Sequence, residues 1–463
     1  MSVVEESRTL PRRGERAPGP RGLAVLRTLN DYRRSPLPTL ENLAKQYGDV
    51  VCVSLAGKRA FLFAHPDLIH HVLIRRGDNY KKTSGTRAAR RFFGSSMQLN
   101  NGEPARSMRR LLAPLFTFDR VASVYGDLIV AETQAMLNHW APGPRPGLTQ
   151  ELMDLLLHIM VRIHFGTPRG EETRRVGRLY ANALALLPEF SFPEWVPTRR
   201  NRRYVAAVRA LDATLLDRIA AQRRLDRGEA DLVAEFLRLG LDDLQIRHEL
   251  VSMMAASYRT VGMTLVQTLR LMAENPAVDA QVAAEVWNAA VPAADAGASR
   301  ETPALLQKLP YTGKVLRESL RLCPPAGLMM RRTAADDVVG GWPVPAGSRI
   351  LLSSWLVQRD PRYYDAPLAF RPERWTPDFE RALPACAYFP FGAGARSCIG
   401  GILSDVTLRL IVATIARRYR LEAAVTPADQ SAWPLLLARE GLRAVLHPRR
   451  NIRIERERGE RNS

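Results

Sequence analysis

A glycine-rich stretch around one cysteine holds the residue types of this chain that are best suited to chemistry. Residues 388–401 read YFPFGAGARSCIGG, with glycines where a backbone can approach another group closely. A helix is expected to follow at residues 402–418, so Cys398 would lie near the positive end of its dipole and two residues from the cation of Arg396. Both effects would lower the pKa of the thiol and favour the thiolate, which is a nucleophile or a metal ligand.

This stretch by itself leaves several kinds of site open. It contains no second cysteine and no histidine beside Cys398, which excludes an ordinary zinc site and leaves a catalytic thiol or a haem iron ligand. A buried cysteine without chemistry fits the turn equally well. A dinucleotide-binding loop fits less well, because the third glycine of that fingerprint is missing and no acidic residue follows at the required distance.

The elements that must position this stretch are mostly helical. Across residues 65–290 apolar residues recur with the period of a helix, and another helix is expected at residues 306–322. Strand patterns are short: a hairpin at residues 49–64 and segments within residues 337–352. The sequence therefore predicts a mainly α fold with a small β region.

Composition bounds the remaining classes of protein. The chain of 463 residues is 46% hydrophobic, and its four cysteines show no disulfide framework, so we expect a reduced, cytoplasmic protein. Residues 1–20 are polar and lack an apolar segment, which predicts a disordered leader rather than a signal peptide or membrane anchor. Residues 21–463 are expected to form a single domain.

The charge of the chain points to the kind of partner. The formal net charge is +20, but the sequence shows no zinc finger, RNP motif or basic zipper, so nucleic-acid binding is not expected. The basic residues are scattered through the expected helices. An acidic protein partner fits this charge better.

Two further elements precede the cysteine and give it a context. Glu318 and Arg321 are three residues apart on the expected helix 306–322, so they share a face. Residues 370–375 read FRPERW, and the Cys398 stretch follows. In this order the three elements resemble the cytochrome P450 family, with its Glu-x-x-Arg helix, its Pro-Glu-Arg segment and its Phe-Gly-x-Gly-x-Arg-x-Cys-x-Gly loop. The resemblance extends from residue 18 to the final strands.

The resemblance implies a role for each of these residues. Cys398 would be the axial thiolate ligand of a haem b iron, and Phe391 would lie beside the haem at the start of the loop. Glu318, Arg321 and Arg374 would form a buried charged network that holds the irregular segment before the loop. The implied architecture is the P450 fold, a helix-rich triangular prism with the haem between a long distal helix and the helix after the cysteine.

The resemblance also implies cations for the haem propionates. Arg109, Arg332 and Arg396 occupy the positions of propionate-binding arginines. Ala105 departs from the family pattern, in which a tryptophan or histidine four residues before the first arginine contacts a propionate. A neighbouring arginine on the same helix would either replace that contact or face solvent.

The distal helix is expected at residues 246–274. Within it, residues 256–261 read ASYRTV where the family usually has Ala-Gly-x-Asp/Glu-Thr-Thr. Thr260 therefore matches the threonine that hydrogen-bonds dioxygen and its water. Ser257 replaces the glycine, and Arg259 replaces the acid that relays protons.

Arg259 leads to three hypotheses, because arginine stays charged and only donates hydrogen bonds. It could turn outward into a salt bridge, so that Thr260, Ser257 and water deliver protons. It could face the pocket and clamp an anionic group of the substrate, bidentately for a carboxylate. In the third hypothesis the enzyme runs non-standard chemistry.

The substrate pocket would be apolar and adaptable, which suits a hydrophobic small molecule. Its walls, by resemblance, are the distal helix, the segment after a Pro-Pro turn and an aromatic loop at residues 187–195. The wall residues are Met253, Ala256, Leu328, Met329 and Met330.

The resemblance implies insertion of one oxygen atom from dioxygen into a hydrophobic small molecule, in bacterial secondary metabolism. Electrons would come from a separate ferredoxin or flavodoxin system, and an acyl or peptidyl carrier protein is an alternative partner that would carry the substrate. Peroxide-driven oxygenation is a second enzymatic hypothesis, motivated by Arg259. A haem-thiolate sensor or binding protein is the non-enzymatic hypothesis.

Overall fold

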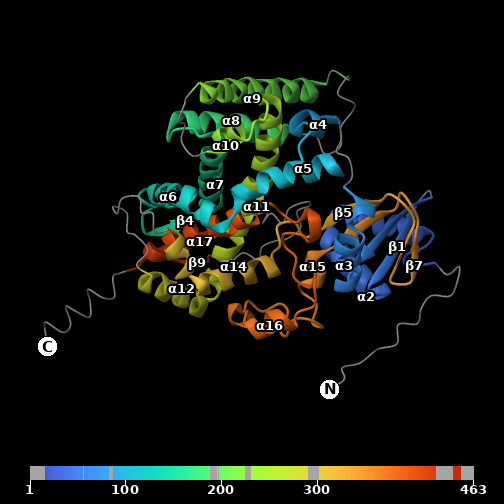
Figure 1. Ribbon diagram of the computed structural model, residues 1–463. Helices are drawn as coiled ribbons and strands as arrows, with labels where there is room; N and C mark the ends of the chain where they lie inside the picture. Colours follow the sequence, from blue (N-terminus) through green and yellow to red (C-terminus); the bar gives the residue numbers. More distant parts are fainter. Residues whose placement is uncertain are drawn as a thin grey trace, which may run out of the picture.

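A long helix, α11 (Asp243–Glu274), organises the arrangement of the other helices (Figure 1). It begins at a capping box, in which the Asp242 side chain accepts from the Gln245 backbone and the Gln245 side chain accepts from the Asp242 backbone. It ends before Pro276, which cannot continue a helix. The predicted helix at residues 246–274 is confirmed and begins three residues earlier than expected.

The computed structural model describes residues 16–55, 57–82, 87–187, 196, 198–224, 231–289, 302–423 and 442–449. The predicted aromatic loop lies outside this part of the chain, apart from Leu187. The other helices are α1 (Leu23–Arg34), α2 (Pro36–Tyr47), α3 (Pro66–His70), α4 (Arg87–Phe93), α5 (Glu103–Leu112), α6 (Phe118–Leu137), α7 (Leu148–Phe165), α8 (Glu171–Leu186), α9 (Arg199–Arg223), α10 (Leu232–Arg238), α12 (Pro276–Asn288), α13 (Thr302–Gln307), α14 (Pro310–Leu322), α15 (Ser354–Val357), α16 (Pro377–Ala382) and α17 (Gly401–Arg418).

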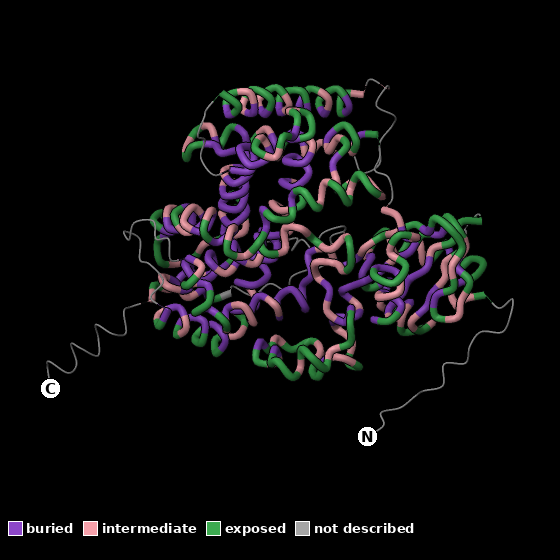
Figure 2. Tube along the Cα trace, in the orientation of Figure 1, coloured by how far each residue is buried: buried purple, intermediate pink, exposed green. Residues whose placement is uncertain are grey.

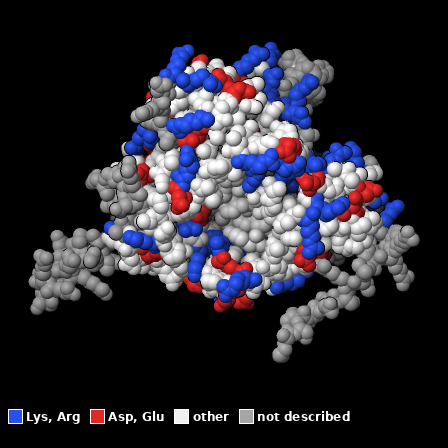
Figure 3. Space-filling view, viewed as in Figure 1, with Lys and Arg blue, Asp and Glu red and all other residues white. Residues whose placement is uncertain are grey.

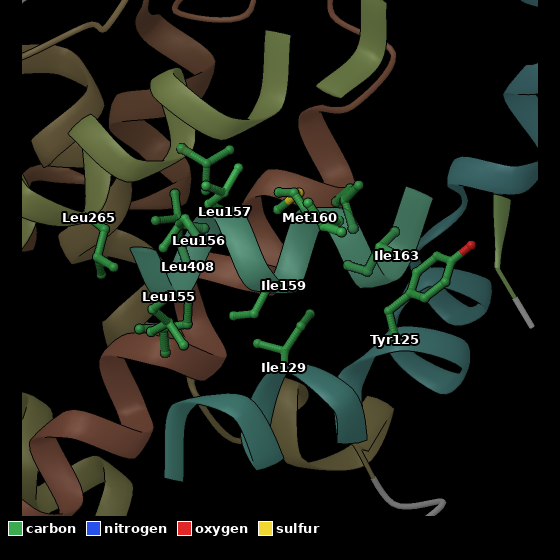
Figure 4. Close-up of a cluster of buried hydrophobic side chains, with 14 of the residues drawn as sticks. Tyr125, Ile129, Leu155, Leu156, Leu157, Ile159, Met160, Ile163, Leu265 and Leu408 are labelled. Atoms are coloured by element: carbon green, nitrogen blue, oxygen red, sulfur yellow. The ribbon is translucent and has the colours of Figure 1, made fainter. Parts of the chain in front are cut away.

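The core lies between α6, α7, α11 and α17 (Figure 4). Helix α7 is buried over most of its surface, and Leu155, Leu156 and Ile159 pack with Leu265 of α11 and Leu408 of α17 within one cluster. A helix that is apolar on nearly all sides must lie inside the protein. Figure 2 shows this buried column, with exposed residues concentrated on the outer helices and loops.

The five-stranded sheet lies to one side of the helices, whereas β4 and β9 of a three-stranded sheet lie among the helices near α12 and α17 (Figure 1). One sheet has the strand order β1-β2-β8-β5-β3, in which β2 and β8 are parallel and the other neighbours are antiparallel. The strands are β1 (Val50–Leu55), β2 (Lys58–Phe63), β3 (Tyr80–Lys81), β4 (Gly143–Arg145), β5 (Met329–Thr333), β6 (Asp337–Val339), β7 (Trp342–Val344), β8 (Arg349–Leu352), β9 (Tyr419–Ala423) and β10 (Ala444–Pro448). The predicted hairpin is β1–β2, and the mainly α fold with a small β region is confirmed.

Two expectations about the chain need correction. Residues 16–20 do not continue the expected disordered leader, because Pro20 is buried and the Cys52 N–H donates to the Pro18 carbonyl at 2.7 Å. The helix expected at residues 306–322 is two helices, α13 and α14, because Pro310 begins a new helix after Leu309.

Positive side chains are spread over the visible face and interspersed with acidic ones (Figure 3). Within the described ranges, every helix is too short or too polar to cross a bilayer.

Candidate active site

The backbone of the cysteine loop is held in one shape by glycines and by backbone hydrogen bonds. Gly392 and Gly394 both have φ of +71°, a conformation that other residues rarely adopt. A Cβ atom on Gly394 would lie 2.3 Å from the Leu73 carbonyl oxygen, so glycine is required there. The Cys398 N–H donates to the Phe391 carbonyl at 2.7 Å. The loop therefore closes on itself and presents the thiol just before α17.

Cys398 is exposed, and it is the cavity that its thiol lines. The protein packed around the thiol beyond the cavity desolvates it and raises its pKa, and the Gly400 N–H and the Arg109 guanidinium oppose that rise without cancelling it. The expectation of a lowered pKa is therefore wrong for the protein alone, because desolvation outweighs the charges. The cation that acts on the thiol is Arg109 rather than Arg396.

The cavity has a volume of about 540 Å³ and lies between the cysteine loop and α11. Phe391 and Cys398 line one side of it, and Ala256, Ser257 and Thr260 line the distal side. Met160 and His164 of α7 and Phe116 add to the wall. The sequence-predicted thiol and the sequence-predicted distal residues are thus brought to opposite walls of one cavity.

Cations gather at one end of this cavity. Lys82, Arg106, Arg109 and Arg396 line it, and Asp78 is the acidic residue among its lining residues. Burial and the nearby guanidinium groups of Arg331, Arg396 and Arg109 lower the pKa of Lys82 to about 8. Cations that repel one another in a partly buried site require an anion to balance them. The two carboxylates of a haem meet this need, so the residues present fit that group.

Hydrogen bonds to the backbone hold two of these arginines in place. Arg109 donates to the Ser397 carbonyl at 2.6 Å and to the Ser397 hydroxyl at 3.2 Å. Arg396 donates to the Tyr80 carbonyl at 2.8 Å. The predicted positions of Arg109 and Arg396 beside the cysteine loop are thus observed, and both arginines are fixed before any ligand binds.

The prediction for Arg332 is wrong by one position. Side chains alternate along β5, and Arg332 points to the exposed face, beside Gly347. Arg331 points inward, where burial and Arg396 lower its pKa to about 10. Arg331 is therefore the arginine of β5 that joins the cationic end.

Ala105 lines the cavity, as its position in the family pattern implies. Arg106 also lines the cavity, and it donates to Glu103 and, at 3.0 Å, to Asp78, whereas Arg110 donates to Glu103 and does not line the cavity. Lys82 adds the further cation. No local pattern predicts Lys82 at this site, since its place beside the arginines depends on the pairing of β3 with β5.

The predicted network of Glu318, Arg321 and Arg374 is observed. Arg321 donates to both carboxylate oxygens of Glu318 at 2.9 and 2.8 Å, and Arg374 donates to Oε1 at 2.9 Å. The Trp375 indole donates to Oε2 at 3.0 Å, and the Arg371 N–H donates to Oε1 at 3.1 Å. The network ties α14 to the irregular segment that leads to the cysteine loop.

On α11 the side chains of Ser257 and Thr260 reach the cavity. The Thr260 hydroxyl donates to the Ala256 carbonyl, and the Thr264 hydroxyl donates to the Thr260 carbonyl at 2.9 Å. Each hydroxyl is thus oriented by the preceding turn of the helix. Thr260 lies where the sequence places it.

Arg259 is half-buried and does not line the cavity. Successive side chains of an α-helix point about 100° apart. Because Thr260 faces the cavity, the neighbouring Arg259 side chain points away from it. The clamp hypothesis therefore has no support from the geometry. The outward salt bridge is not observed either, since no acidic partner contacts Arg259 within the described residues.

The predicted pocket wall is correct in part. Met253, Ala256 and Met329 line the cavity. Leu328 instead packs in a separate cluster with Leu40 and Leu62, and Met330 is exposed, because alternation along the strand turns both away from Met329.

Two polar residues of the distal side were missed by sequence reasoning. Gln98 lines the cavity, and its Oε1 accepts from the Ser252 hydroxyl at 2.7 Å. Glu249 is buried, its Oε1 accepts from the Met97 N–H at 2.7 Å, and burial raises its pKa to about 7. Both contacts join residues more than 150 positions apart, so no local pattern announces them.

Residues 17–446 match the family described as Cytochrome P450. The chain is 33% identical over 408 residues to the cyclooctat-9-en-7-ol 5-monooxygenase of Streptomyces melanosporofaciens, and the aligned region covers 84% of this chain and 85% of that protein. It is 30% identical over 434 residues to the pentalenene oxygenase of Streptomyces avermitilis, and the aligned region covers 90% of this chain and 92% of that protein.

Solved structures share the fold. The cytochrome P450DA heme domain superposes with a TM-score of 0.80 at 20% identity, covering 94% of this chain and 98% of that one. The cyanobacterial CYP120A1 with retinoic acid bound superposes with a TM-score of 0.79 at 22% identity, covering 94% and 99%.

Proposed function

The chain belongs to the cytochrome P450 family of monooxygenases, and on that premise we propose that it inserts one oxygen atom into a cyclic terpenoid, using haem b held by Cys398. The observation that carries the proposal is the cavity with the Cys398 thiol on one wall, Thr260 on the other and cations at one end. These are the three groups that a haem-thiolate oxygenase needs: an axial ligand, a distal hydroxyl and partners for the propionates.

When bound, the haem would supply the activation of dioxygen and its transfer to carbon. The remaining work falls to side chains of this chain. Arg109, Arg396, Arg331 and Lys82 would neutralise the two propionates. Met253, Ala256 and Met329 would pack against an apolar skeleton and exclude bulk water from it.

Proton supply would rest on hydroxyl groups. Asp78 is the acidic residue of the cavity lining, and it lies at the cationic end. The Thr260 hydroxyl and the Ser257 hydroxyl lie on the distal wall, and a water held by them would pass protons inward. Thr260 would therefore position the proton donor, and Arg259 would not take part.

The substrate class follows from the apolar wall and from the two relatives. One relative is named for an alcohol, cyclooctat-9-en-7-ol, and the other for pentalenene. Both names fit a cyclic skeleton in a mostly apolar cavity. We propose bacterial secondary metabolism as the setting and a ferredoxin or flavodoxin as the electron donor, because the net charge of +20 favours an acidic partner.

The test is oxygen-dependent turnover by purified holoprotein. Pentalenene and cyclooctat-9-en-7-ol are supplied with a ferredoxin, its reductase and the reductant, and a singly oxygenated product is expected from at least one of them. A carbon monoxide difference spectrum of the reduced protein reports thiolate ligation beforehand. A correctly ligated protein that forms no oxygenated product from either compound would contradict the proposal.

Peroxide-driven oxygenation is a second candidate, favoured by the absence of a carboxylate beside Thr260 on the described distal wall. The same assay with peroxide and no reductant separates the two. Product formation at a matching rate would support the peroxide route, and product formation that requires the reductant would support the monooxygenase.

A further inference from the structure

A pair of polar side chains, Gln98 and Ser252, interrupts the apolar distal wall. Ser252 on α11 is 2% exposed, and its hydroxyl donates to the Gln98 Oε1 at 2.7 Å. Gln98 comes from the segment between α4 and α5, so the pair bridges the two elements that form the roof of the cavity. Around it the lining residues Met97, Met253 and Ala255 are apolar.

The backbone around Gln98 is held from two further directions. Lys82 Nζ donates to the Gln98 carbonyl at 3.1 Å, and the Met97 N–H donates to the Glu249 carboxylate at 2.7 Å. With Oε1 already engaged by Ser252, the side-chain amide cannot rotate freely. Gln98 is an exposed residue that lines the cavity, and its remaining group is the Nε2 amide, which has no hydrogen-bond partner among the residues that the structure describes.

We propose that Gln98 donates a hydrogen bond from Nε2 to a hydroxyl or carbonyl oxygen that the substrate already carries. This deepens the proposed function and rests on it: the substrate is an oxygenated cyclic terpenoid rather than the bare hydrocarbon. A site with an oriented amide rejects an analogue that lacks the matching oxygen, because the amide would lose its water without gaining a partner.

The helix sets how far apart the two oxygens lie on the substrate. Ser252 and Thr260 are eight residues apart on α11, which places them about 12 Å apart along its axis. Gln98 would hold the existing oxygen at the level of Ser252, and the new oxygen would enter near Thr260. The site of attack is therefore remote from the oxygen already present, across a fused ring skeleton.

This geometry also gives the enzyme a place in a reaction sequence. Cyclisation of a terpenoid precursor can leave a pure hydrocarbon, which offers Nε2 no acceptor. A reaction that places a hydroxyl or carbonyl on the ring skeleton must therefore come before this one. The class of that reaction is an earlier hydroxylation, an addition of water or an alcohol oxidation.

The experiment compares three ligands with one skeleton. Perhydroanthracene, its 2-alcohol and its 2-ketone are titrated into the holoprotein, and Kd values come from the ligand-induced Soret shift and from calorimetry. One net hydrogen bond corresponds to roughly 3- to 10-fold in Kd. We expect Gln98→Leu to raise the Kd of the alcohol and of the ketone by that factor, and to change the Kd of the hydrocarbon by less than about twofold.

Two matched variants sharpen the assignment. Gln98→Glu replaces the donor with an acceptor of the same shape. An alcohol can donate to that carboxylate and a ketone cannot, so the variant should still bind the alcohol and should bind the ketone more weakly. Ser252→Ala frees the amide without removing it, so it should weaken both oxygenated ligands less than Gln98→Leu does. A ketone that binds Gln98→Leu as well as it binds the wild type would overturn the donor role of Nε2.

The outcomes separate this inference from the proposed function. If Gln98→Leu weakens all three ligands equally, Gln98 only shapes the wall, and the inference fails while the apolar pocket stands. If none of the three ligands binds wild-type holoprotein with a normal carbon monoxide spectrum, the proposed function fails first.

Discussion

Two buried carboxylates near the cavity have opposite surroundings. Glu318 on α14 receives five hydrogen bonds, from Arg321 twice, Arg374, the Trp375 indole and the Arg371 backbone. Glu249 on α11 receives one from Met97, and its Oε2 has no hydrogen-bond partner in the described part of the chain. Burial accordingly raises the pKa of Glu249 to about 7.

The difference separates a rigid side of the site from an adjustable one. On the proximal side, the charged network and the glycine turns each allow a single arrangement, and the cysteine loop is fixed before any ligand binds. On the distal side, the segment that contains Gln98 is held by fewer contacts: the Met97 N–H donates to Glu249, and Gln98 accepts from Ser252 and Lys82. Such an arrangement keeps the haem ligand constant while the substrate wall can change.

Removing Glu318 should have the largest effect. Glu318→Ala leaves Arg321 buried without its anion, which destabilises the fold by about 3–5 kcal/mol and should abolish haem incorporation. The measurements are the haem-to-protein ratio and the denaturation midpoint. Glu380→Ala is the control, since that exposed carboxylate pairs with Arg317 at the surface and should change stability by less than about 1 kcal/mol. A normal yield of holoprotein from Glu318→Ala would refute the role of the network.

Substitution of the neighbours Arg109 and Arg110 tests whether the cations at the end of the cavity hold the haem. Arg109→Leu removes charge-assisted hydrogen bonds at the cavity, worth about 1.5–3 kcal/mol, so haem should dissociate roughly 10- to 100-fold more readily. Arg110→Leu removes a similar charge that is exposed and paired with Glu103. Haem transfer to apomyoglobin measures both. Equal losses from the two variants would show that only overall charge matters.

Ionisation of Glu249, which lies on the distal side, should make the free energy of unfolding depend on pH. Its pKa is raised in the folded protein, so its favourable contribution is complete below the unfolded value and is lost as pH rises through about 7. Glu249→Gln cannot ionise, so the variant should gain on the wild type by about 1–3 kcal/mol between pH 5 and 8. Urea unfolding at both pH values measures this. Parallel losses in the two proteins would mean that Glu249 is already charged at pH 5.

Thr260 should affect coupling rather than binding. Thr260→Ala should lower product per reductant consumed by roughly 5- to 10-fold, since one positioning hydrogen bond is worth about 1 kcal/mol. Thr268→Ala is the matched control, because its hydroxyl also donates to the preceding turn but lies away from the cavity. If both variants lose coupling alike, the effect belongs to the helix and not to the hydroxyl.

Arg259 should have the smallest effect. Because it does not line the cavity, Arg259→Ala should change the Kd of dodecanoic acid by less than about twofold. The Soret shift on titration provides the measurement. A tenfold increase in the Kd of dodecanoic acid would restore the clamp hypothesis and remove the contrast between the fixed and the adjustable side.

Much of the proximal side could be read from the chain because its chemistry is local. The loop around Cys398 is contiguous, and Glu318 and Arg321 are one helical turn apart, so residue order and spacing carry the information. Arg374 follows because its segment has its own motif. Arg332 shows the limit of this reasoning. Two adjacent arginines on a strand point to opposite faces, and only the pairing of β5 with β8 decides which faces inward.

The sequence by itself determined the family, the mainly helical fold, the thiol at Cys398 and the threonine at residue 260. These depend on short motifs and on helical periodicity, which neighbouring residues specify. Only the tertiary structure decided that Arg331 rather than Arg332 joins Lys82, that Arg259 turns away from the cavity and that Ser252 orients Gln98. Those results depend on the rotation of each helix or strand about its axis and on contacts between distant segments, which packing of the whole chain selects.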